Sequence, residues 1–574
     1  MANVADNMVS VLEANGVKRV YGIPGDSLNG FTDALRISGK IEWVHVRHEE
    51  AAAFAAGAEA ALTGELAVAA GSCGPGNLHL INGLFDANRS RVPVLAIAAH
   101  IPTQEIGSTY FQETHPQDLF KEASVYAEYV ASPEQMPRVL EIAIREAVEK
   151  RGVAVVVIPG DVALAPAKDS RVVSIPRSHP VVVPSADELK AAADILNSSE
   201  KVTILAGAGV EGAHDEVVAL ADALGAPIVH ALRGKEHIEY DNPFDVGLTG
   251  LLGFSSGYRA MEDADALLMI GTDFPYQQFY PKHARTIQID IRGSQLGRRH
   301  PLELGLVGDS RATAEALLPL ISRKTRRSHL EGAVKHYEKT RAKLDELAVP
   351  SRGKAPIHPQ YLARLIDELA DSDAIFTADV GSPVVWAGRY LTMTRERRLL
   401  GSFNHGSMAN ALVQAIGAQA THRDRQVIAF AGDGGLAMLL GELITLTQNQ
   451  LPVKTVVFNN SSLNFVELEM KAAGFVNYGT ELKNPNFAKV ADAIGLKGFR
   501  VERSKDLKGA VAEFLAYDGP AVLDVITERQ ELSMPPTISL EQMKGFTLYA
   551  LRTVMSGRGD ELIDLAKANW RQLF

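Results

Sequence analysis

Two short polar segments in the last third of the chain carry the residues best suited to chemistry. Gly432-Asp433-Gly434-Gly435 and Asn459-Asn460 each follow an apolar run of the kind that forms a buried strand. Asp433 and Asn460 offer the hard oxygen atoms that Mg²⁺ or Ca²⁺ prefers, and the glycines let backbone N–H groups approach a phosphate at the start of a helix. Either segment alone would be an ordinary turn. Together they predict a site for a divalent metal and a phosphate group.

A second candidate lies near the N-terminus, where two carboxylates open an alanine-rich stretch. Glu49 and Glu50 follow the strand-like residues 43–46 and precede a helical run at 51–58. Acidic residues are favoured in the first turn of a helix because they face the positive end of its dipole. From the residues alone, each of these carboxylates is either helix-stabilising or catalytic.

Short β-branched runs recur along the chain and alternate with helical patterns. Such continuous apolar strands are typical of parallel sheets covered by helices on both faces, so we predict an α/β fold with three doubly wound parallel-sheet domains. The expected domains are 1–182, 183–340 and 341–530, followed by a short helical tail at 531–574. In open parallel sheets, ligands bind at the carboxyl ends of the strands, which is where the metal segments lie.

Composition argues against several classes of protein. The net charge of −11 over 574 residues does not suit a dedicated nucleic-acid binder, which needs clustered Lys and Arg. Cys73 is the one cysteine, so no disulfide can form within the chain. The N-terminus has no secretory pattern, and no apolar run approaches the roughly 20 residues of a membrane-spanning helix. We expect a cytoplasmic protein that is at most peripheral to a membrane.

The paired metal segments resemble those of the thiamine-diphosphate enzymes, and the likeness extends over nearly the whole chain. The resemblance implies that Asp433, Asn460 and the carbonyl of Ser462 hold Mg²⁺, which in turn binds the diphosphate. It also implies the following thiamine-diphosphate contacts: Glu49, Gly406, Ser407, Met408, Asp433, Gly434, Gly435, Asn460, Ser461, Ser462, Leu463, Asn464, Phe465 and Val466.

The resemblance also gives roles to individual side chains. It assigns to Glu49, rather than Glu50, the hydrogen bond to the aminopyrimidine ring that activates the cofactor. It assigns to Met408 the wedge between the two cofactor rings. In this family the first domain of one subunit pairs with the third domain of another. The chain is therefore expected to form a homo-oligomer, namely a tetramer.

Three segments of the middle domain resemble the FAD-contacting loops of pyruvate oxidases. An acidic residue after a strand, such as Asp290, can hydrogen-bond the ribose of a dinucleotide. The alternative is that these segments are ordinary strand ends, because many members of the family have no flavin. The expected FAD contacts are Thr249, Gly250, Leu251, Leu252, Thr272, Asp273, Phe274, Pro275, Tyr276 and Asp290.

Four further residues are implied at the reacting centre. In pyruvate oxidases an aromatic side chain matching Phe465 lies between thiamine and flavin, residues matching Phe111 and Gln112 line the centre, and a carboxylate matching Glu469 lies near the substrate. Phe465 could equally be a core aromatic, which is the commoner fate of Phe. Asn464 stands where the family has Gly, and Asn tolerates a left-handed backbone better than most residues.

The resemblance is strongest to the quinone-dependent pyruvate oxidases. It implies oxidative decarboxylation of pyruvate to acetate and CO₂, with electrons passing through FAD to a membrane ubiquinone or menaquinone. The alternatives are an oxygen- or phosphate-dependent pyruvate oxidase, an acetohydroxyacid synthase whose FAD has no net redox role, and a catalytically inactive flavoprotein. Intact Glu49, Asp433 and Asn460 argue against the last of these.

The tail carries an apolar stripe from residue 560 onward. It consists of Leu562, Leu565, Ala566 and Leu573, with Ile563, Trp570 and Phe574 one face over. Such a helix either lies in a bilayer surface or packs on its own protein, and composition favours packing. The resemblance to the membrane-binding tail of the quinone-dependent enzymes favours a lipid-responsive switch, with the protein at the inner face of the cell membrane once activated.

Overall fold

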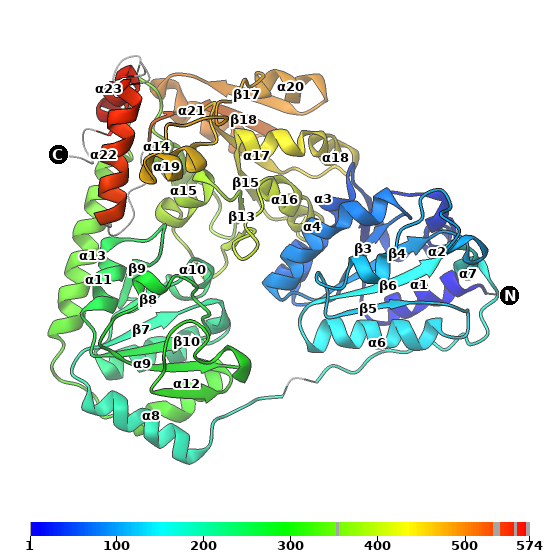
Figure 1. The fold of residues 1–574 in the computed structure, drawn as a ribbon, viewed down its shortest axis with the longest axis horizontal. Coiled ribbons are helices and arrows are strands. Elements are labelled where there is room, and N and C mark those ends of the chain that lie inside the picture. The colour runs from blue at the N-terminus through cyan, green and yellow to red at the C-terminus, as the bar shows by residue number, and fades with distance from the viewer. Residues whose placement is uncertain (1, 179, 352–354, 532–539, 556–558, 570–574) are drawn as a thin grey trace.

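The computed structural model describes residues 2–178, 180–351, 355–531, 540–555 and 559–569. Three six-stranded sheets follow one another along the chain, and all of their strand pairs are parallel (Figure 1). Helices cover both faces of each sheet. The predicted α/β fold with three doubly wound domains is therefore confirmed.

The first sheet has the strand order β2-β1-β3-β4-β6-β5. Its strands are β1 (Arg19–Gly22), β2 (Glu42–His45), β3 (Ala67–Gly71), β4 (Val94–His100), β5 (Tyr126–Tyr129) and β6 (Val153–Pro159). Its helices are α1 (Val4–Ala14), α2 (Asn29–Ser38), α3 (Glu49–Thr63), α4 (Pro75–Ser90), α5 (Pro116–Leu119), α6 (Met136–Glu149) and α7 (Gly160–Leu164).

The second sheet has the order β12-β11-β10-β7-β8-β9. Its strands are β7 (Val202–Ala206), β8 (Ile228–His230), β9 (Asp245–Leu248), β10 (Ala266–Ile270), β11 (Arg285–Asp290) and β12 (Leu304–Val307). Its helices are α8 (Ala186–Ser198), α9 (His214–Leu224), α10 (Lys235–Ile238), α11 (Ser255–Glu262), α12 (Ser310–Leu317) and α13 (Ser328–Leu347). The last of these stays helical across the boundary that we placed at residue 340.

The third sheet has the order β14-β13-β15-β16-β18-β17. Its strands are β13 (Ile375–Ala378), β14 (Arg398–Leu400), β15 (Val427–Gly432), β16 (Lys454–Asn459), β17 (Lys497–Val501) and β18 (Ala521–Ile526). Its helices are α14 (Pro359–Leu369), α15 (Ser382–Tyr390), α16 (Asn410–Thr421), α17 (Asp433–Met438), α18 (Leu443–Gln448), α19 (Asn464–Ala472), α20 (Phe487–Ala493) and α21 (Ser504–Ala516).

The strand orders locate the places where ligands can enter. The first and third sheets share one order when their strands are numbered from one, and the chain reverses direction between β1 and β3 and between β13 and β15. The middle sheet has the order of dinucleotide-binding folds, with its reversal between β7 and β10. Ligands bind at such reversal points, beyond the carboxyl ends of the strands.

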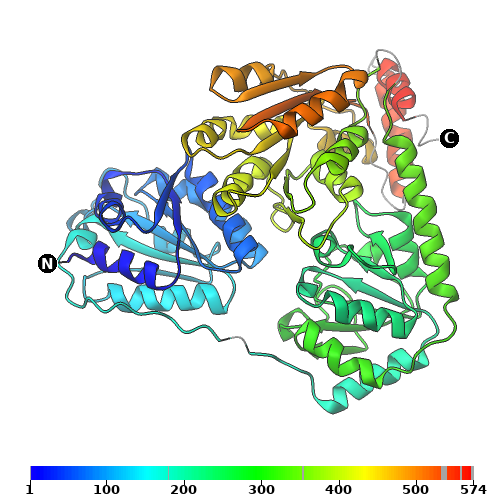
Figure 2. The ribbon, with the colours of Figure 1, turned by 180° about the vertical axis from the view of Figure 1, so that it is seen from behind.

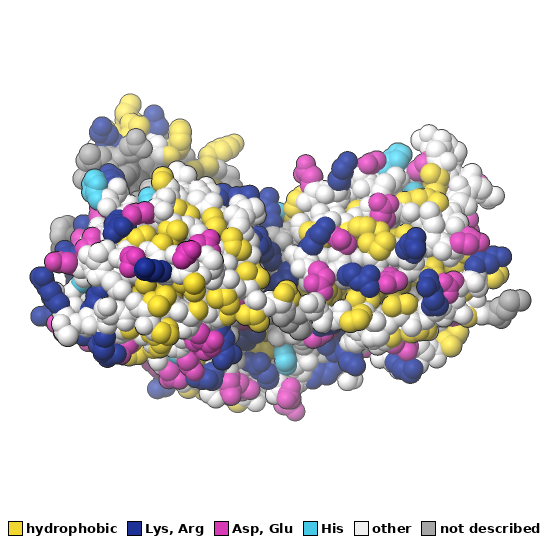
Figure 3. Space-filling view, turned by 90° about the horizontal axis from the view of Figure 1, so that it is seen from below, with side chains coloured by type: hydrophobic (Ala, Val, Ile, Leu, Met, Phe, Trp, Pro, Cys, Tyr) yellow, Lys and Arg dark blue, Asp and Glu magenta, His cyan; other side chains and the backbone are white. Residues whose placement is uncertain are grey.

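The domains contact one another through helices rather than sheets. Helix α3 of the first domain packs on α16 of the third, so closely that a Cβ on Gly417 would lie 2.1 Å from the carbonyl oxygen of Ala55. The chain after α7 packs on the first domain as far as Ile175, which is buried in its core. The described residues from there to α8 form an extended connection to the middle domain (Figure 2). Seen from below, the molecule shows two lobes over which basic and acidic side chains are interspersed (Figure 3).

Two further helices, α22 (Leu540–Met555) and α23 (Gly559–Ala568), form the described part of the tail and pack on the third domain. Of the predicted stripe, Leu565 is buried and Leu562 half-buried, and both pack with Tyr549 of α22 and Leu468 of α19. Ala566 is exposed. Trp570, Leu573 and Phe574 lie outside the described residues. Within the described ranges, no helix is long and apolar enough to span a bilayer.

Candidate active site

The carboxylate of Asp433 is the centre of the third-domain site. Asp433 begins α17 directly after β15, at the reversal point of the sheet, and is only 3% exposed. Its oxygens accept hydrogen bonds from the backbone N–H groups of Gly434 (2.9 Å), Asn460 (3.1 Å) and Ser461 (2.6 Å), and from the Asn484 side chain (2.7 Å). Burial raises the pKa of this carboxyl despite these donors.

This arrangement fits a divalent cation. Among the described residues, no Lys, Arg or His forms an ion pair with Asp433, so its buried charge lacks a protein counterion. No cluster of three His, Cys, Asp or Glu side chains within the described ranges could hold a metal by itself. A cation beside Asp433 would therefore need oxygens from Asn460, Ser462 and a diphosphate. In this structure, the side-chain oxygen of Asn460 accepts a hydrogen bond from the backbone N–H group of Ser462 at 3.0 Å.

Apolar residues close over the Asp433 loop. A Cβ on Gly434 would lie 2.8 Å from Leu463 and 3.5 Å from the Met408 methyl group, so Met408 lies beside the Asp433 loop. Leu463 precedes α19, and its N–H group donates to the Thr480 carbonyl. Gly435 also has little room, because a Cβ added at this position would lie 2.2 Å from a side-chain oxygen of Asp379. A side chain at either position would have to displace these neighbours.

Several backbone conformations at this site are unusual. Ala409 and Ser461 have φ angles of 61° and 58°, the left-handed region that residues other than glycine rarely adopt. Ala409 follows Met408, and Ser461 lies between two predicted metal ligands. Gly406 is also left-handed, with φ of 87°. Strained backbone of this kind concentrates at binding and catalytic sites.

The sequence analysis missed Asp379. It follows β13 at the reversal point and is buried, with one oxygen accepting from the Ala411 N–H group (2.9 Å) and the other from the Gly432 N–H group (3.1 Å). Asp379 thus joins the loop after β13 to the loop after β15. The rule that ligands bind after strands could have identified it, because residues 374–377 are a recognisable strand. Asn484 was missed because nothing nearby in the sequence points to its role.

The first domain contributes a second group of predicted residues. Glu49 begins α3 and is 6% exposed, with one oxygen 2.9 Å from Nδ1 of His79. A Cβ on Gly76 would lie 3.1 Å from the other oxygen. Gln112, with φ of 64°, lies against Gly74 and accepts from the Cys73 thiol at 3.3 Å. Phe111 is 77% exposed.

Within this chain, Glu50 rather than Glu49 connects to the third domain. The Asn82 amide nitrogen donates to Glu50 (2.7 Å) and to the Ser407 hydroxyl (3.0 Å). No hydrogen bond among the described residues joins Glu49 to the third domain. Within one chain, the predicted site residues therefore lie in two clusters, one around Glu49 in the first domain and one around Asp433 in the third. Among the described residues, no hydrogen bond joins Glu49 to Asp433.

The predicted FAD loops meet at the reversal point of the middle sheet. A Cβ on Gly207, after β7, would lie 2.5 Å from the Gly271 carbonyl oxygen, after β10. Thr272 is buried and accepts from Gln288 through its carbonyl, and Asp273 forms an ion pair with Arg299 at 2.9 Å. The loops after β7 and β10 therefore contact each other at the carboxyl edge of the sheet, with their backbones in close contact.

Unpaired polar atoms at this edge fit a polar ligand. The Thr249 hydroxyl and the Nε and Nη2 atoms of Arg292 are buried, and the described residues offer them no hydrogen-bond partner. Buried donors without partners are rare in proteins. Asp290, the last residue of β11, accepts from the backbone N–H group of Arg292 at 2.9 Å and lies 3.7 Å from Arg292 Nε. A dinucleotide with ribose and diphosphate oxygens would satisfy such groups.

The loop after β9 bridges the middle and third domains. Arg389 of α15, which is buried, donates through Nε to the Leu252 carbonyl at 2.9 Å. The Gly250 position lies against the Phe274 ring, and Leu251 is exposed. Of the remaining predicted FAD contacts, Pro275 and Tyr276 are both exposed.

The reacting-centre residues of the third domain lie at the start of α19. Phe465 is half-buried against the third-domain core, and Val466 and Glu469 are exposed. Burial and the nearby negative charge of Glu469 raise the pKa of the Tyr276 phenol. The expected flavin loop therefore lies close to the helix that carries Phe465 and Glu469.

The left-handed backbone considered for Asn464 is not found. Asn464 is the first residue of α19, and its φ is not positive. Its side chain explains its presence, since it accepts from the Ser382 hydroxyl at 3.0 Å and donates to the Arg529 carbonyl at 2.7 Å. Asn464 thus ties the start of α19 to two neighbouring segments.

Comparison with known protein families gives three matches in chain order. Residues 2–121 match the N-terminal thiamine pyrophosphate binding domain of thiamine pyrophosphate enzymes. Residues 189–317 match the central domain, and residues 379–525 match the C-terminal thiamine pyrophosphate binding domain. Each match covers most of one sheet.

Individual relatives extend over nearly the whole chain. A putative thiamine pyrophosphate-containing protein, YdaP of Bacillus subtilis (strain 168), is 36% identical over 98% of this chain and 98% of its own. The pyruvate oxidase of Lactiplantibacillus plantarum is 31% identical over 90% and 87%. A probable acetolactate synthase large subunit of Methanocaldococcus jannaschii is 30% identical over 93% of both chains. With its three matched domains and these relatives, the chain belongs to the thiamine pyrophosphate enzyme family.

Proposed function

We propose that this protein oxidatively decarboxylates pyruvate: pyruvate, water and a quinone yield acetate, CO₂ and the quinol. The observation that carries the proposal is the bond between the expected flavin loop and the third domain, where Arg389 of α15 donates to the Leu252 carbonyl at 2.9 Å. A flavin bound at the middle sheet would then lie beside the residues expected around the thiamine ring. Electron transfer between two cofactors needs such proximity.

Each cofactor has its own chemical task. Bound thiamine diphosphate supplies a nucleophilic carbon and an electron sink for decarboxylation, and FAD accepts an electron pair. On this proposal, Asp433, Asn460 and Ser462 would hold Mg²⁺ and with it the diphosphate, and Met408 would pack against the bound cofactor. Glu49 holds a proton at the ring nitrogen of the aminopyrimidine. The apolar residues around Met408 keep water from the reacting carbon.

The test of this proposal is the colour of the flavin. Holoenzyme mixed with pyruvate under anaerobic conditions should lose its flavin absorbance, and acetate should accumulate when ferricyanide is added as acceptor. A flavin that stays oxidised while acetolactate forms would refute the oxidative reaction.

A carboligase is the second candidate. The full-length similarity to a protein named as a probable acetolactate synthase favours it, at an identity close to that of the pyruvate oxidase. In this reaction two pyruvate molecules give acetolactate and CO₂, and the flavin has no net redox role. The same experiment separates the two candidates because only one of them reduces the flavin.

We further propose that a membrane quinone is the electron acceptor and that the tail brings the enzyme to the inner face of the cell membrane. Helix α22 supports this, because Leu548, Leu551, Val554 and Met555 are exposed along one side, with Met555 86% exposed. Apolar residues at helical spacing suit a bilayer surface. The opposite side, with Tyr549 and Thr553, is buried against the protein.

A further inference from the structure

Helix α19 contains an ion pair that is fully buried. Glu467 and Lys471 are one helical turn apart, with Nζ 2.8 Å from Oε1, and their side chains are 0% and 1% exposed. Helical pairs of this spacing usually lie on the surface, as Arg145 and Glu141 do in α6. Burying two charges costs free energy that a well-packed apolar pair would not require. The pair therefore calls for a functional reason.

Glu467 is also bonded to the metal loop. Its second oxygen, Oε2, accepts a 2.6 Å hydrogen bond from the hydroxyl of Ser462, which is itself buried. A hydrogen bond to an ionised group is short and strong. Ser462 is the residue whose carbonyl is expected to bind Mg²⁺, and it follows the left-handed Ser461. Without this hydrogen bond to Glu467, only backbone interactions would fix the position of Ser462.

The far side of the pair is closed by the β18 extension and the tail. The Lys471 ammonium donates to the Gln530 side-chain oxygen (2.5 Å), and the Gln530 amide donates back to Glu467 (3.2 Å). The Tyr549 ring of α22 lies 5.5 Å from Lys471 Nζ. Asn569 donates to the Gln530 carbonyl at 2.6 Å. Every polar atom of the pair is thus engaged.

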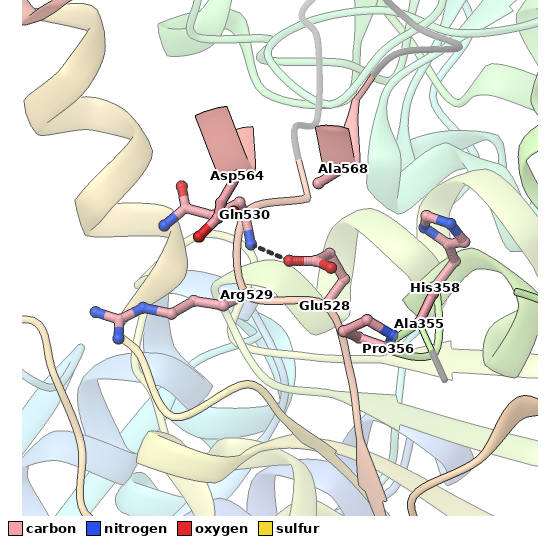
Figure 4. Close-up of a pocket in the computed structure, with 8 residues that line it drawn as sticks. All are labelled: Ala355, Pro356, His358, Glu528, Arg529, Gln530, Asp564 and Ala568. Carbon is pink, nitrogen blue, oxygen red and sulfur yellow. Dashed lines mark hydrogen bonds between the residues drawn. The ribbon is translucent and has the colours of Figure 1, made fainter. Parts of the chain in front are cut away.

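A cavity lies beside this network, between the Gln530 segment and α23. Its volume is about 520 Å³, and Figure 4 shows Glu528, Arg529 and Gln530 on one side and Asp564 and Ala568 of α23 on the other. The Glu467–Lys471 pair itself is excluded from the cavity lining. Water in the cavity therefore has no direct access to the pair.

We propose that Glu467 is a positioning residue for the metal site and that Lys471 is its counterion. Glu467 fixes the Ser462 hydroxyl and thereby the direction of the Ser462 carbonyl. Lys471, together with Arg529 at 3.7 Å from the other oxygen, allows this carboxylate to remain charged in a buried position. The inference rests on the proposed metal-dependent binding of thiamine diphosphate and adds a residue to it. Groups that orient metal ligands typically change metal affinity by about 10- to 100-fold when they are replaced.

The test measures metal binding without measuring activity. Apoenzyme is titrated with Mn²⁺ in the presence of saturating thiamine diphosphate, and free Mn²⁺ is followed by electron paramagnetic resonance. Glu467→Gln should weaken Mn²⁺ binding by about tenfold. Ser462→Ala should do the same, and the double variant Ser462→Ala/Glu467→Gln should be no worse than either, because both changes remove one interaction.

A second double variant separates positioning from stability. Glu467→Gln leaves Lys471 buried without its partner, so it should also lower the melting temperature. Glu467→Gln/Lys471→Met removes the unpaired charge and should recover stability while metal binding stays weak. Recovery of Mn²⁺ affinity together with stability would overturn the proposal, because the pair would then be structural only.

A matched control exists in the middle domain. Lys235 of α10 and Glu239, which directly follows that helix, form another pair one turn apart, with side chains 4% and 14% exposed. Glu239→Gln should lower stability and leave Mn²⁺ affinity unchanged; an equal loss of affinity would also refute a specific role for Glu467. If wild-type protein binds no Mn²⁺ with thiamine diphosphate, the proposed function fails instead, and the two failures are distinguishable.

Discussion

At the residue scale, a single buried carboxylate carries the metal site. Asp433 has four hydrogen-bond donors around it, and it forms no ion pair with a basic side chain in the part of the chain that the structure describes. Amide donors orient its oxygens but leave its charge uncompensated in a buried position, where an isolated charge is costly. A divalent cation removes that cost. On the proposed function, the oxygens of the diphosphate would add to this single carboxylate in holding the metal.

Asp433→Ala should abolish binding of thiamine diphosphate. The substitution leaves Mg²⁺ with neutral protein oxygens only, and it also frees the N–H groups of Asn460 and Ser461. Binding can be measured by quenching of tryptophan fluorescence during cofactor titration at limiting Mg²⁺. Normal affinity in the purified variant would show that the metal lies elsewhere.

Glu49→Gln should keep the fold and slow proton exchange at the C2 carbon of the bound cofactor by orders of magnitude. A neutral amide cannot share a proton with the pyrimidine as a carboxyl group does. Exchange in deuterated water, followed by acid quenching and NMR, measures the rate. Glu50→Gln is the matched control, because Glu50 bonds Asn82 in this structure. A larger defect in the control would transfer the role to Glu50.

Glu442 gives a prediction for stability against pH. Burial raises the pKa of this carboxyl from 4.5 to about 7, although its oxygens accept from the Thr445 hydroxyl and the Arg47 N–H group. A raised pKa means that the folded state prefers the protonated form. Its contribution to stability is therefore complete below pH 4.5 and is lost as the pH rises through about 7.

Glu442→Gln cannot ionise, so the free energy of unfolding of the variant minus that of wild type should rise with pH across this window. The expected rise is about 1–3 kcal/mol. Urea unfolding of the apoenzyme at several pH values measures it, with Glu513→Gln on the exposed side of α21 as the control substitution. A difference that falls with pH would contradict the assignment.

The residues that sequence reasoning found and missed differ in one physical respect. Asp433 and Asn460 were predictable because glycines and a strand end flank them, so the local pattern carries the signal. Asp379 also follows a recognisable strand and could have been found in the same way. Asn484 bonds Asp433 and Asn459, which lie far from it along the chain, and no local pattern reveals such partners. Asn464 was misjudged because its side chain, rather than its backbone, has the special role.

At the element scale, the strand order determines which sequence motifs lie next to one another and can form a site. The apolar runs predicted the parallel strands, but not which strands are neighbours. Only the observed orders show that β13 and β15 flank the reversal in the third sheet and that β7 and β10 flank it in the middle sheet. Strand order depends on long-range pairing, which the period of a run does not encode.

The tail helices give an element-scale prediction. An enzyme truncated after residue 535 should be highly active with ferricyanide in the absence of lipid and should not co-sediment with liposomes. The reason is that α22 and α23 pack on α19, the helix that carries Phe465 and Glu469, so their removal uncovers this part of the site. Assays use saturating Mg²⁺ and thiamine diphosphate. A truncated enzyme that still sediments with liposomes on addition of pyruvate would exclude the tail as the anchor.

At the scale of the whole molecule, the predicted active-site residues of one chain lie in two separate clusters. Glu49 lies with Gly76 and His79 in the first domain, and Asp433 lies in the third. Glu50 is linked to the third domain instead, because Asn82 of α4 donates both to Glu50 and to Ser407, which lies shortly before α16. A pairing between subunits would bring the Glu49 group of one chain to the Asp433 group of another, and closed symmetry would create two such sites in each pair.

Mixing two inactive variants tests this arrangement. If each site combines Glu49 of one subunit with Asp433 of its partner, a pair made from Glu49→Gln and Asp433→Ala chains contains one site with both residues intact. Unfolding and refolding the two variants together should then restore about one quarter of wild-type activity, because random pairing makes half of the pairs mixed. Each variant refolded alone is the control and should stay inactive. If both residues of a site came from one chain, every site in the mixture would lack one of them and no activity would return.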